Sequence, residues 1–456
     1  MGSFKVIIAG GGLAGALLAN GLSNNGVEFM IYERDEADSK REGYQIRLGP
    51  GAQAGFRACL TSAHIDKITA KLGKSSGSQA TAPSIYNTHF EEIVDLALVP
   101  TYSKSAAINR VVLRDILLDP IKKSGKISYG KNVHSYEILS QTNGAEKVKV
   151  FFSDGSHDVC DVLVGADGAN SQINKQLGLD NIRLLDSHWC FCSKGSLPFD
   201  RMMNLPPKLR EGPIMVLSKR SILYYALYLP EEQTKGNISE AADSTESLRY
   251  DESAASFYWA LNVPVSALPY RKASEIQDHR LVCLEAIKDW APEFHNMLSV
   301  GGDDPEHTDM LVTQFRASTQ PRADWRAEAR KIGKDKGHPR VWVIGDAIHA
   351  MQPTRGQGGN QALADCADIL PQLLRLDSLA SIDPVRPTFE EVETACNSYE
   401  STMTARAFPW VKKSGGVSFP SVNLDGLLGI AIRSLAKLIV PLLKSYYSLF
   451  GQKKEG

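Results

Sequence analysis

The chain has 456 residues, of which 43% are hydrophobic and 23% are charged, a composition typical of a globular protein with a large buried core. Its 51 Lys and Arg residues and 52 Asp and Glu residues leave a net charge of -1, which argues against nucleic-acid binding because such binders carry a basic excess. The seven cysteines follow neither disulfide nor zinc-ligand spacing, so no metal site is expected. No signal peptide precedes the first apolar run, and we expect a cytoplasmic protein.

The first forty residues predict a strand, a glycine turn, a helix and a second strand. Residues 4–9 form a continuous apolar run, which is typical of a strand buried on both faces in a parallel sheet. Residues 13–23 have the apolar spacing of a helix, and residues 28–32 are again apolar. This order indicates the beginning of a nucleotide-binding α/β domain.

The turn between the first strand and the helix has the pattern G-x-G-x-x-G, with Gly10, Gly12 and Gly15 followed in the helix by apolar residues. The three glycines permit a tight turn, a close approach of the backbone to a pyrophosphate, and close packing of helix and strand, respectively. Leu13 and Ala14 lie in the first helical turn, where free N–H groups bind anions. The motif therefore predicts a dinucleotide site.

Glu33 ends the second strand, 23 residues after Gly10. A carboxylate at this place accepts hydrogen bonds from a ribose and repels a 2′-phosphate. The site therefore suits FAD or NAD better than NADP, and these residues alone do not separate FAD from NAD.

Two further α/β regions are separated by a β-rich region. Strand-like aromatic runs at 222–228 and 257–261 predict a second domain that interrupts the first. The polar stretch 231–256 is expected to be an exposed loop. The expected divisions are a first FAD-binding part, a β-rich substrate domain, a second FAD-binding part and a helical tail, at 1–180, 181–312, 313–412 and 413–456.

Two distant segments indicate which of the two dinucleotides, FAD or NAD, the chain binds. A buried strand at 161–165 delivers Asp167 and Gly168, and another at 341–344 delivers Gly345 and Asp346. With the glycine turn, they make the chain resemble the class A flavoprotein monooxygenases of the p-hydroxybenzoate hydroxylase fold, over roughly residues 1–410. Within that family it is similar to the tetracycline-inactivating and fungal natural-product branches. The resemblance implies an α/β fold with a Rossmann-like FAD-binding domain, an inserted β-rich substrate domain and C-terminal helices.

The resemblance also implies which residues contact FAD. Arg34 and Arg110 are expected at the cofactor, and Asp346 at a ribitol hydroxyl. Asp167 is expected near the flavin or the pyridine nucleotide, the alternative being a turn former at the strand end. For Arg110 the alternative is a surface pair with Asp115. A helix beginning near Asn360 would direct its positive end toward the flavin N1. The four further residues expected at the cofactor are Gly356, Gly358, Gly359 and Asn360.

The chain departs from the family pattern at three positions. Asn174 follows Ser171 where relatives carry an arginine, so reductant contacts through that arginine are in doubt. Arg47 stands where the tetracycline-inactivating branch has an acid, and Lys194 stands where relatives place an arginine beside the substrate. Arg47 and Lys194 are the candidates for catalysis, and a solvated side chain is the alternative for each.

The expected activity is that of an FAD-dependent, NAD(P)H-consuming monooxygenase, in which C4a-hydroperoxyflavin transfers one oxygen of O2 to an electron-rich carbon. NADH or NADPH would visit only transiently, because no second G-x-G-x-x-G is present. Tyr224 and Tyr258 could stack on a flat ligand or fill core. We favour a bulky aromatic natural product of secondary metabolism. Epoxidation or hydroxylation of an indole alkaloid comes first, and a phenolic or tetracycline-like polyketide is the alternative. A non-oxygenating FAD reductase is the competing class.

The tail from 424 to 450 is apolar at helical spacing and is interrupted by Arg433, Lys437 and Lys444. Because a membrane-spanning helix needs about 20 predominantly apolar residues, we expect a helix docked on the protein body. A helix on a membrane surface is the alternative. The sequence does not indicate an oligomeric state.

Overall fold

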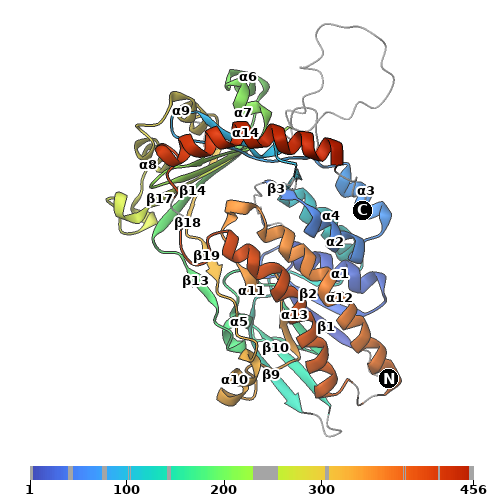
Figure 1. Cartoon of the computed structure of the whole chain (residues 1–456). Helices are drawn as coiled ribbons and strands as arrows, with labels where there is room; N and C mark the ends of the chain where they lie inside the picture. The colour runs from blue at the N-terminus through green and yellow to red at the C-terminus, as the bar shows by residue number, and fades with distance from the viewer. Residues whose placement is uncertain are drawn as a thin grey trace. The chain divides into compact units, whose positions relative to one another are not determined.

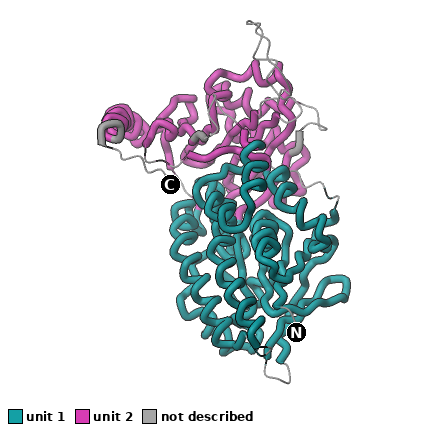
Figure 2. Tube along the Cα trace, turned by 90° about the vertical axis from the view of Figure 1, so that its right-hand side faces the viewer, with its two compact units in different colours: residues 1–70, 110–185, 316–418 teal, residues 71–109, 186–315, 419–456 magenta. Residues whose placement is uncertain are grey.

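The computed structural model describes residues 4–37, 39, 45–73, 80–100, 102, 104–140, 145–229, 255–302, 308–383, 385, 387–419 and 422–450. The chain forms two compact units, each assembled from three segments (Figure 2). Unit 1 comprises residues 1–70, 110–185 and 316–418, and unit 2 comprises 71–109, 186–315 and 419–456. Most of the loop expected at 231–256 lies outside the described residues.

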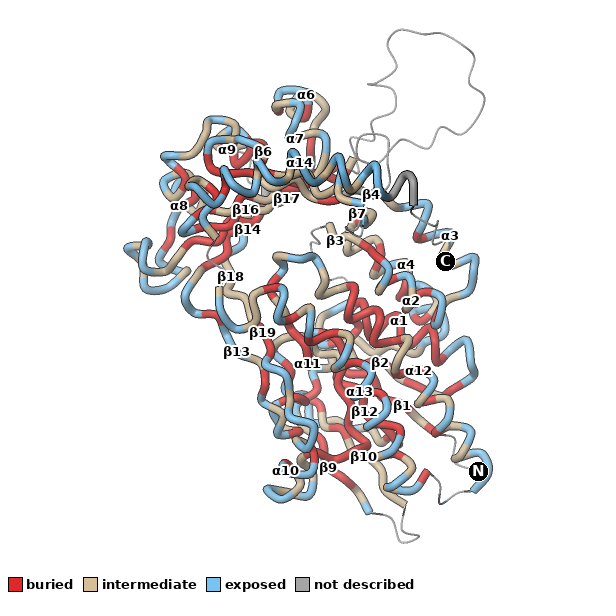
Figure 3. Tube along the Cα trace, viewed as in Figure 1, coloured by how far each residue is buried: buried red, intermediate tan, exposed pale blue. Residues whose placement is uncertain are grey.

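Unit 1 is built on a five-stranded parallel sheet with the strand order β20-β12-β1-β2-β8 (Figure 1). Three of these strands have almost wholly apolar sequences, which lets both faces of the sheet be buried. Figure 3 shows β1 and β12 as buried. The five strands are β1 (Lys5–Ala9), β2 (Glu28–Tyr32), β8 (Ile127–Ser128), β12 (Val162–Gly165) and β20 (Val341–Val343).

Helices and a second sheet pack against this parallel sheet. Helix α1 packs against α2, α4 and α12, and α12 packs against α13. An antiparallel sheet of order β11-β10-β9 contacts β1 and β12. The helices of unit 1 are α1 (Leu13–Asn24), α2 (Pro50–Cys59), α3 (Ser62–Thr69), α4 (Arg110–Lys123), α5 (Gln172–Leu177), α10 (Trp325–Ile332), α11 (Asp346–His349), α12 (Gly358–Ile382) and α13 (Phe389–Lys413). Its other strands are β3 (Gln45–Leu48), β9 (Val133–Ser140), β10 (Glu146–Phe152), β11 (His157–Cys160), β13 (Ile182–Leu184) and β19 (Arg316–Ser318).

Unit 2 is built on a seven-stranded sheet with the order β18-β14-β17-β16-β15-β5-β6. All its pairs are antiparallel except β15–β5. Residues 71–109, which the expected division gave to the FAD-binding domain, belong here because two of their short strands complete this sheet. The seven strands are β5 (Ser84–Tyr86), β6 (Glu92–Asp95), β14 (His188–Ser196), β15 (Ile214–Leu217), β16 (Ile222–Tyr228), β17 (Ser256–Pro264) and β18 (Thr308–Thr313).

One face of the seven-stranded sheet forms the core of unit 2. Trp189 and Phe191 on β14, Trp259 on β17 and Tyr225 on β16 belong to one buried cluster. Alternate residues of a strand point to opposite faces, so the residues between them lie on the second face. The helices of unit 2 are α6 (Phe199–Asn204), α7 (Pro207–Glu211), α8 (His279–Ala286), α9 (Pro292–Leu298) and α14 (Leu427–Phe450), and the short strands β4 (Ala80–Thr81) and β7 (Ser105–Asn109) pair with each other.

Helix α14 is the predicted C-terminal helix, and it continues on both sides of Pro441. It contacts β6. Within the described part of the chain, no helix combines the length and the apolar character that crossing a membrane requires.

Candidate active site

The carboxyl ends of four parallel strands meet at one edge of the unit 1 sheet. In register, Ala9 of β1 lies between Tyr32 of β2 and Gly165 of β12, and Gly165 also pairs with Val343 of β20. The residues that follow these strands therefore lie together although they are far apart in the sequence. They include Gly10, Glu33, Asp167 and Asp346, and this edge is where ligands bind in open α/β sheets.

The glycine turn has two positions that admit no side chain and one that is open. Gly10 has a φ of +111°, and a Cβ built on it would lie 2.4 Å from the carbonyl oxygen of Ala166. A Cβ on Gly15 would lie 2.1 Å from the Gly10 oxygen. Gly12 caps the amino end of α1, and a Cβ built on it would meet no atom of the described residues within 4 Å, its two chain neighbours aside. The open space at Gly12 is where the sequence motif places a pyrophosphate.

Glu33 is buried and holds the glycine turn. Its Oε2 accepts a hydrogen bond of 2.8 Å from the Gly11 N–H, and its Oε1 accepts one of 3.0 Å from the Asp35 N–H. Arg114 is a further residue of this site that the sequence analysis did not predict. Its Nε donates to the Gly11 oxygen at 2.7 Å, and its Nη2 lies 3.3 Å from Glu33 Oε2. A signal was present, since Arg114 is one helical turn after Arg110.

The two arginines expected at the cofactor lie in different surroundings. The Arg34 side chain is 57% exposed, with Nε 3.5 Å from Asp35 Oδ1. Arg110 is half-buried and is the first residue of α4. The alternative partner proposed for Arg110, Asp115, instead lies 3.8 Å from Lys122 Nζ. Arg110 and Arg34 stay predicted contacts of FAD.

Asp167 uses one oxygen to form the strand-end turn and leaves the other without a partner. Oδ2 accepts from the Gln172 N–H at 2.9 Å. Oδ1 is out of solvent and has no hydrogen-bond partner among the described residues. Burial raises the pKa of this carboxyl above its usual value. A ligand hydroxyl that donates to Oδ1 would satisfy it, so both expected roles fit the geometry.

Asn174, where relatives carry an arginine, is a buried structural residue. Its Nδ2 donates to Asn181 Oδ1 at 2.9 Å and to the Ala347 oxygen at 2.7 Å. Asn181 Nδ2 in turn donates to the Ile348 oxygen at 2.9 Å. The side-chain amides of Asn174 and Asn181 connect α5 to α11. Asn174, the residue that departs from the family pattern, therefore supports the loop that carries Asp346.

A buried cluster of charged side chains holds the loop that carries Asp346. Asp365 Oδ2 accepts from the Gly345 N–H at 2.6 Å and lies 2.7 Å from His349 Nε2. Asp365 Oδ1 accepts from Arg406 Nη2 at 2.6 Å, and Arg406 also reaches Asp368 at 2.7 Å. Gly345 has a φ of +62°, and Asp346 is exposed. The cluster therefore fixes a strained turn whose next residue faces solvent.

In this cluster, neighbouring charges shift the pKa values more than burial does. Burial would lower the pKa of His349, but the Asp365 carboxylate raises it above its usual value. Burial would raise the pKa of Asp365, but His349 and Arg406 lower it. The fold therefore favours the ionised form of Asp365 and shifts His349 toward its protonated form.

The segment 353–360 approaches the same edge of the sheet. A 3₁₀ turn at Pro353–Arg355 ends at Gly356, whose φ is +60°, and α12 begins at Gly358, earlier than the expected start near Asn360. A Cβ on Gly358 would lie 3.8 Å from Asp346 Oδ1, and one on Gly359 would lie 3.1 Å from Ile46 Cδ1. The amino end of α12 therefore lies beside Asp346.

The Asn360 side chain is fully used within the protein. Its Oδ1 accepts from the Gly49 N–H at 2.7 Å, and its Nδ2 donates to the oxygens of Arg47 at 2.8 Å and Gly356 at 2.9 Å. A cofactor contact from Asn360 would thus use its main chain. Arg47 is half-buried on β3, which packs against α12, and its catalytic role stays a prediction.

In unit 2, the register places the expected substrate residues on the second face of the large sheet. Lys194 of β14 pairs directly with Tyr258 of β17, and Tyr258 pairs with Ala226 of β16. The rings of Tyr224 and Tyr258 lie 6.3 Å apart, and both side chains are half-buried. None of these residues belongs to the buried core cluster. They therefore lie on the sheet face opposite that core.

Cys192 lies on this same face, two residues before Lys194. Its Sγ is 3.5 Å from Cys190 Sγ and 3.7 Å from the Tyr258 hydroxyl. The hydrogen bond from Cys190 lowers the pKa of Cys192, and the Tyr258 hydroxyl and the Lys194 charge act in the same direction. Cys192 was not among the expected site residues.

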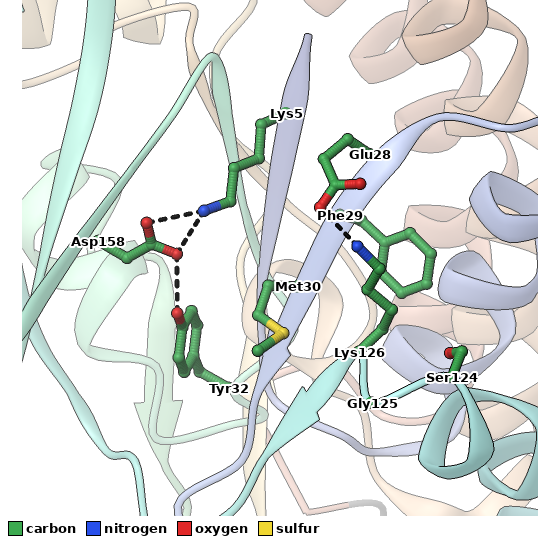
Figure 4. A pocket seen from close by; sticks show the side chains of 9 residues that line it. All are labelled: Lys5, Glu28, Phe29, Met30, Tyr32, Ser124, Gly125, Lys126 and Asp158. Carbon is green, nitrogen blue, oxygen red and sulfur yellow. Dashed lines mark hydrogen bonds and ion pairs between the residues drawn. The ribbon is translucent and has the colours of Figure 1, made fainter. Parts of the chain in front are cut away.

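A pocket of about 240 Å³ in unit 1 is not part of this site (Figure 4). Lys5 lies 2.6 Å from Asp158, which also accepts from Tyr32 at 2.7 Å, and Lys126 lies 2.6 Å from Glu28. These charges satisfy one another, and neither the glycine turn nor Asp346 lines the pocket. We assign it no role in binding.

The unit 1 site fits a dinucleotide of the FAD type. Glu33 offers a carboxylate beside the glycine turn, Gly12 leaves open space at a helix amino end, and Asp167 Oδ1 lacks a partner among the described residues. Asp346 is exposed beside the amino end of α12. This set of acceptors for hydroxyls and N–H groups for phosphate matches the chemistry of that cofactor.

Comparison with known proteins agrees with this geometry. A family model described as FAD binding domain matches residues 3–191 and 307–376, more than half of the chain. The dual O-methyltransferase/FAD-dependent monooxygenase elcB of Phaeosphaeria nodorum is 24% identical over 90% of this chain and 45% of its own length. This chain thus spans less than half of elcB. The FAD-dependent monooxygenase thnD of Trichoderma harzianum is 26% identical over 96% of each chain.

A solved structure shares the fold. Klebsiella pneumoniae HpxO, complexed with FAD and uric acid, superposes with a TM-score of 0.64 at 18% identity and covers 97% of each chain. The expected fold class and the expectation of FAD as the bound cofactor are therefore confirmed. The chain belongs to the FAD binding domain family and has the fold of the class A flavoprotein monooxygenases.

Proposed function

We propose that this protein is an FAD-dependent monooxygenase that consumes NADH or NADPH and O2. The observation that carries the proposal is the meeting of four strand ends, which gathers the glycine turn, Glu33, Asp167 and Asp346 at one edge. When bound, FAD supplies the redox chemistry, in which a hydride from NAD(P)H reduces O2, one oxygen atom enters the substrate and the other leaves as water.

The residues of unit 1 bind and orient the cofactor. The N–H groups at the start of α1 would bind the pyrophosphate, and Glu33 would accept from a ribose hydroxyl. Asp346 would accept from the ribitol chain, and Asp167 Oδ1 from a further hydroxyl or N–H. The amino end of α12 would direct its positive dipole toward the flavin ring, where it stabilises negative charge.

The second face of the unit 2 sheet is the proposed substrate face. Tyr224 and Tyr258 offer aromatic surface for stacking, and Lys194 offers an ammonium donor beside Tyr258. A bulky, flat, electron-rich substrate suits such a face. An indole alkaloid that undergoes 2,3-epoxidation or hydroxylation is the first candidate, and a phenolic polyketide is the second. HpxO was solved with uric acid, a flat bicyclic compound. This neighbour supports a nitrogen heterocycle as the substrate.

The test measures oxygen incorporation. We expect the purified protein to be yellow and to oxidise NAD(P)H faster with an indole or phenolic substrate. Under 18O2, the product should contain one labelled atom, and O2 uptake should match product formation. Stoichiometric bound FAD with NAD(P)H oxidation but no labelled product from any substrate of either class would contradict the proposal and favour a reductase.

The substrate face is tested separately with Lys194→Ala. We expect full FAD retention and a tenfold to hundredfold lower kcat/KM, equivalent to about 1.4–2.7 kcal/mol. Lys272→Ala, which changes an exposed lysine elsewhere in unit 2, is the matched control and should behave as the wild type. Unchanged turnover in Lys194→Ala would remove Lys194 from the site.

A further inference from the structure

Helix α14 exposes a continuous apolar stripe. Leu427 is 85% exposed, Leu435 56%, Leu438 67% and Leu442 68%, and Figure 3 shows most of this helix as exposed. Other large apolar side chains with exposures of 36% or more lie on the same helix; they are Leu428, Ile430, Ile432, Ile439 and Tyr446. At 3.6 residues per turn, all but Ile430 fall within about 140° of the circumference. Isolated exposed leucines are ordinary, but a stripe of this length marks an interaction surface.

This stripe is not the face by which α14 is attached to unit 2. The residues that are less exposed recur every three or four positions on a different side, at Arg433, Ala436, Val440 and Leu443. Arg433 lies 3.1 Å from Glu91, and the helix contacts β6. The helix is therefore anchored on one side and presents its apolar stripe on another.

Polar contacts fix the chain just before α14. Asp425 Oδ1 accepts from both the N–H and the hydroxyl of Thr88 at 2.8 Å. The Leu424 N–H donates to the Leu217 oxygen at 3.4 Å. The stripe is thus carried by a helix whose start is held to the sheet.

The charge of this helix has one sign. Residues 427–450 contain Arg433, Lys437 and Lys444 and no acidic residue. Within the described part of the chain, Lys437 and Lys444 form no ion pair, and they lie on the side of the helix opposite the middle of the stripe. An apolar face with lysines on the polar side is the pattern of a helix that lies in a membrane interface, and the positive charge complements anionic headgroups.

We propose that α14 binds the surface of an anionic lipid bilayer, with its leucine stripe among the acyl chains and its lysines at the headgroups. A second copy of this chain fits the helix less well. Helix pairs of that kind place charges of both signs beside the apolar seam, whereas α14 offers only cations. The proposal does not depend on the oxygenase assignment, because membrane binding requires no turnover.

The experiment is flotation of the full-length flavoprotein with vesicles of phosphatidylcholine, either pure or with a third of phosphatidylserine. We expect the protein to float with the anionic vesicles and to be released as salt is raised. The triple variant Leu435→Glu, Leu438→Glu, Leu442→Glu should lose at least tenfold in the bound fraction and keep its FAD content.

The matched control places the same three charges at apolar residues of similar exposure outside α14. These are Leu281, Ile332 and Ile382, which are 63%, 74% and 73% exposed, and their change to Glu should leave flotation unchanged. Should the leucine variant fail to fold, Lys437→Glu with Lys444→Glu tests the charge alone and should weaken binding to anionic vesicles severalfold.

Three results would overturn the proposal. One is wild-type protein that stays at the bottom with both vesicle types, and another is flotation that survives the leucine substitutions. The third comes from light scattering: a wild-type dimer that the same substitutions convert to a monomer would show that a second copy covers the stripe.

Discussion

The candidate site residues lie at different places on the two large sheets. In unit 1 the polar side chains follow the strands and are bound to nearby main chain, as Glu33 is to Gly11 and Asp167 is to Gln172. In unit 2 the candidate residues alternate along the strands with core residues, as Lys194 does with Ser193. A site at strand ends leaves contiguous motifs in a sequence, whereas a site on a sheet face leaves only every second residue.

The glycine turn offers the sharpest way to separate folding from cofactor binding in unit 1. We expect Gly15→Ala to lower the unfolding free energy by about 4 kcal/mol or more, because its Cβ meets the Gly10 oxygen at 2.1 Å. Gly12→Ala should lower the unfolding free energy by only about 1 kcal/mol. Alanine is a poorer helix cap than glycine, but its Cβ would meet open space. The substitution should weaken FAD binding about a hundredfold, or ~2.7 kcal/mol.

Chemical denaturation of the apoprotein and flavin fluorescence titration measure the two effects. A Gly12→Ala variant that holds FAD as tightly as the wild type would contradict the assignment of the phosphate site. Equal destabilisation by both substitutions would remove the distinction between a packing glycine and a binding glycine.

The buried cluster below the 345–349 turn predicts the next largest effect. We expect Asp365→Asn to lower the unfolding free energy by about 3–5 kcal/mol, because it leaves His349 buried without a carboxylate partner and removes one of the two carboxylates that Arg406 contacts. Asp368→Asn, at a carboxylate 17% exposed, is the matched control and should cost about 1 kcal/mol. Denaturant titration of both variants checks the difference, and equal costs would show that Asp365 is no more important than its neighbour.

Much of unit 1 could be predicted from sequence because its binding residues directly follow apolar strands. The sequence pattern predicted Glu33, Asp167 and Asp346 at the ends of strands, and the resemblance to the monooxygenase family assigned Asp167 and Asp346 to the cofactor; the strand register brings all three to one edge. Arg114 was not predicted, although it lies one helical turn after Arg110 on α4, because spacing within a helix does not show which distant turn the helix contacts. The same limit applies to β5 and β6, whose three- and four-residue runs are too short to indicate a sheet.

The unit 2 face was predicted only in part. Aromatic runs indicated strands, but Tyr225 and Tyr258 are equally aromatic and face opposite sides. Only the pairing register assigns one to the core and the other to the second face. Cys192 was missed in part for the same reason, since Tyr258, which it contacts on this face, comes from a different strand.

The ionisation of His349 predicts a smaller effect that depends on pH. Its pKa is raised in the fold, so its contribution to stability is complete below the unfolded value of about 6.5 and is lost as pH rises through the folded pKa. We expect His349→Gln to be less stable than the wild type near pH 5.5. The difference should shrink in alkaline buffer. A difference that stays constant from pH 5.5 to alkaline buffer would contradict an ionised His349.

The smallest effect concerns thiol reactivity in unit 2. The lowered pKa of Cys192 predicts that it is alkylated first by iodoacetamide at neutral pH. Cys283 and Cys396 are buried with raised pKa values and should react slowly. Peptide mapping at intervals measures the order, and substrate bound to the Lys194 face should slow the labelling of Cys192. Earlier labelling of Cys283 would contradict the prediction.

The parallel sheet of unit 1 is completed late in the chain. Strand β12 and strand β20 come from residues 162–165 and 341–343, and β20 brings the turn that holds Asp346. A ribosome-bound polypeptide therefore lacks one wall of the proposed flavin site until about three quarters of the chain has emerged. We expect cofactor loading to follow synthesis of β20, so translation products that end before residue 341 should be colourless.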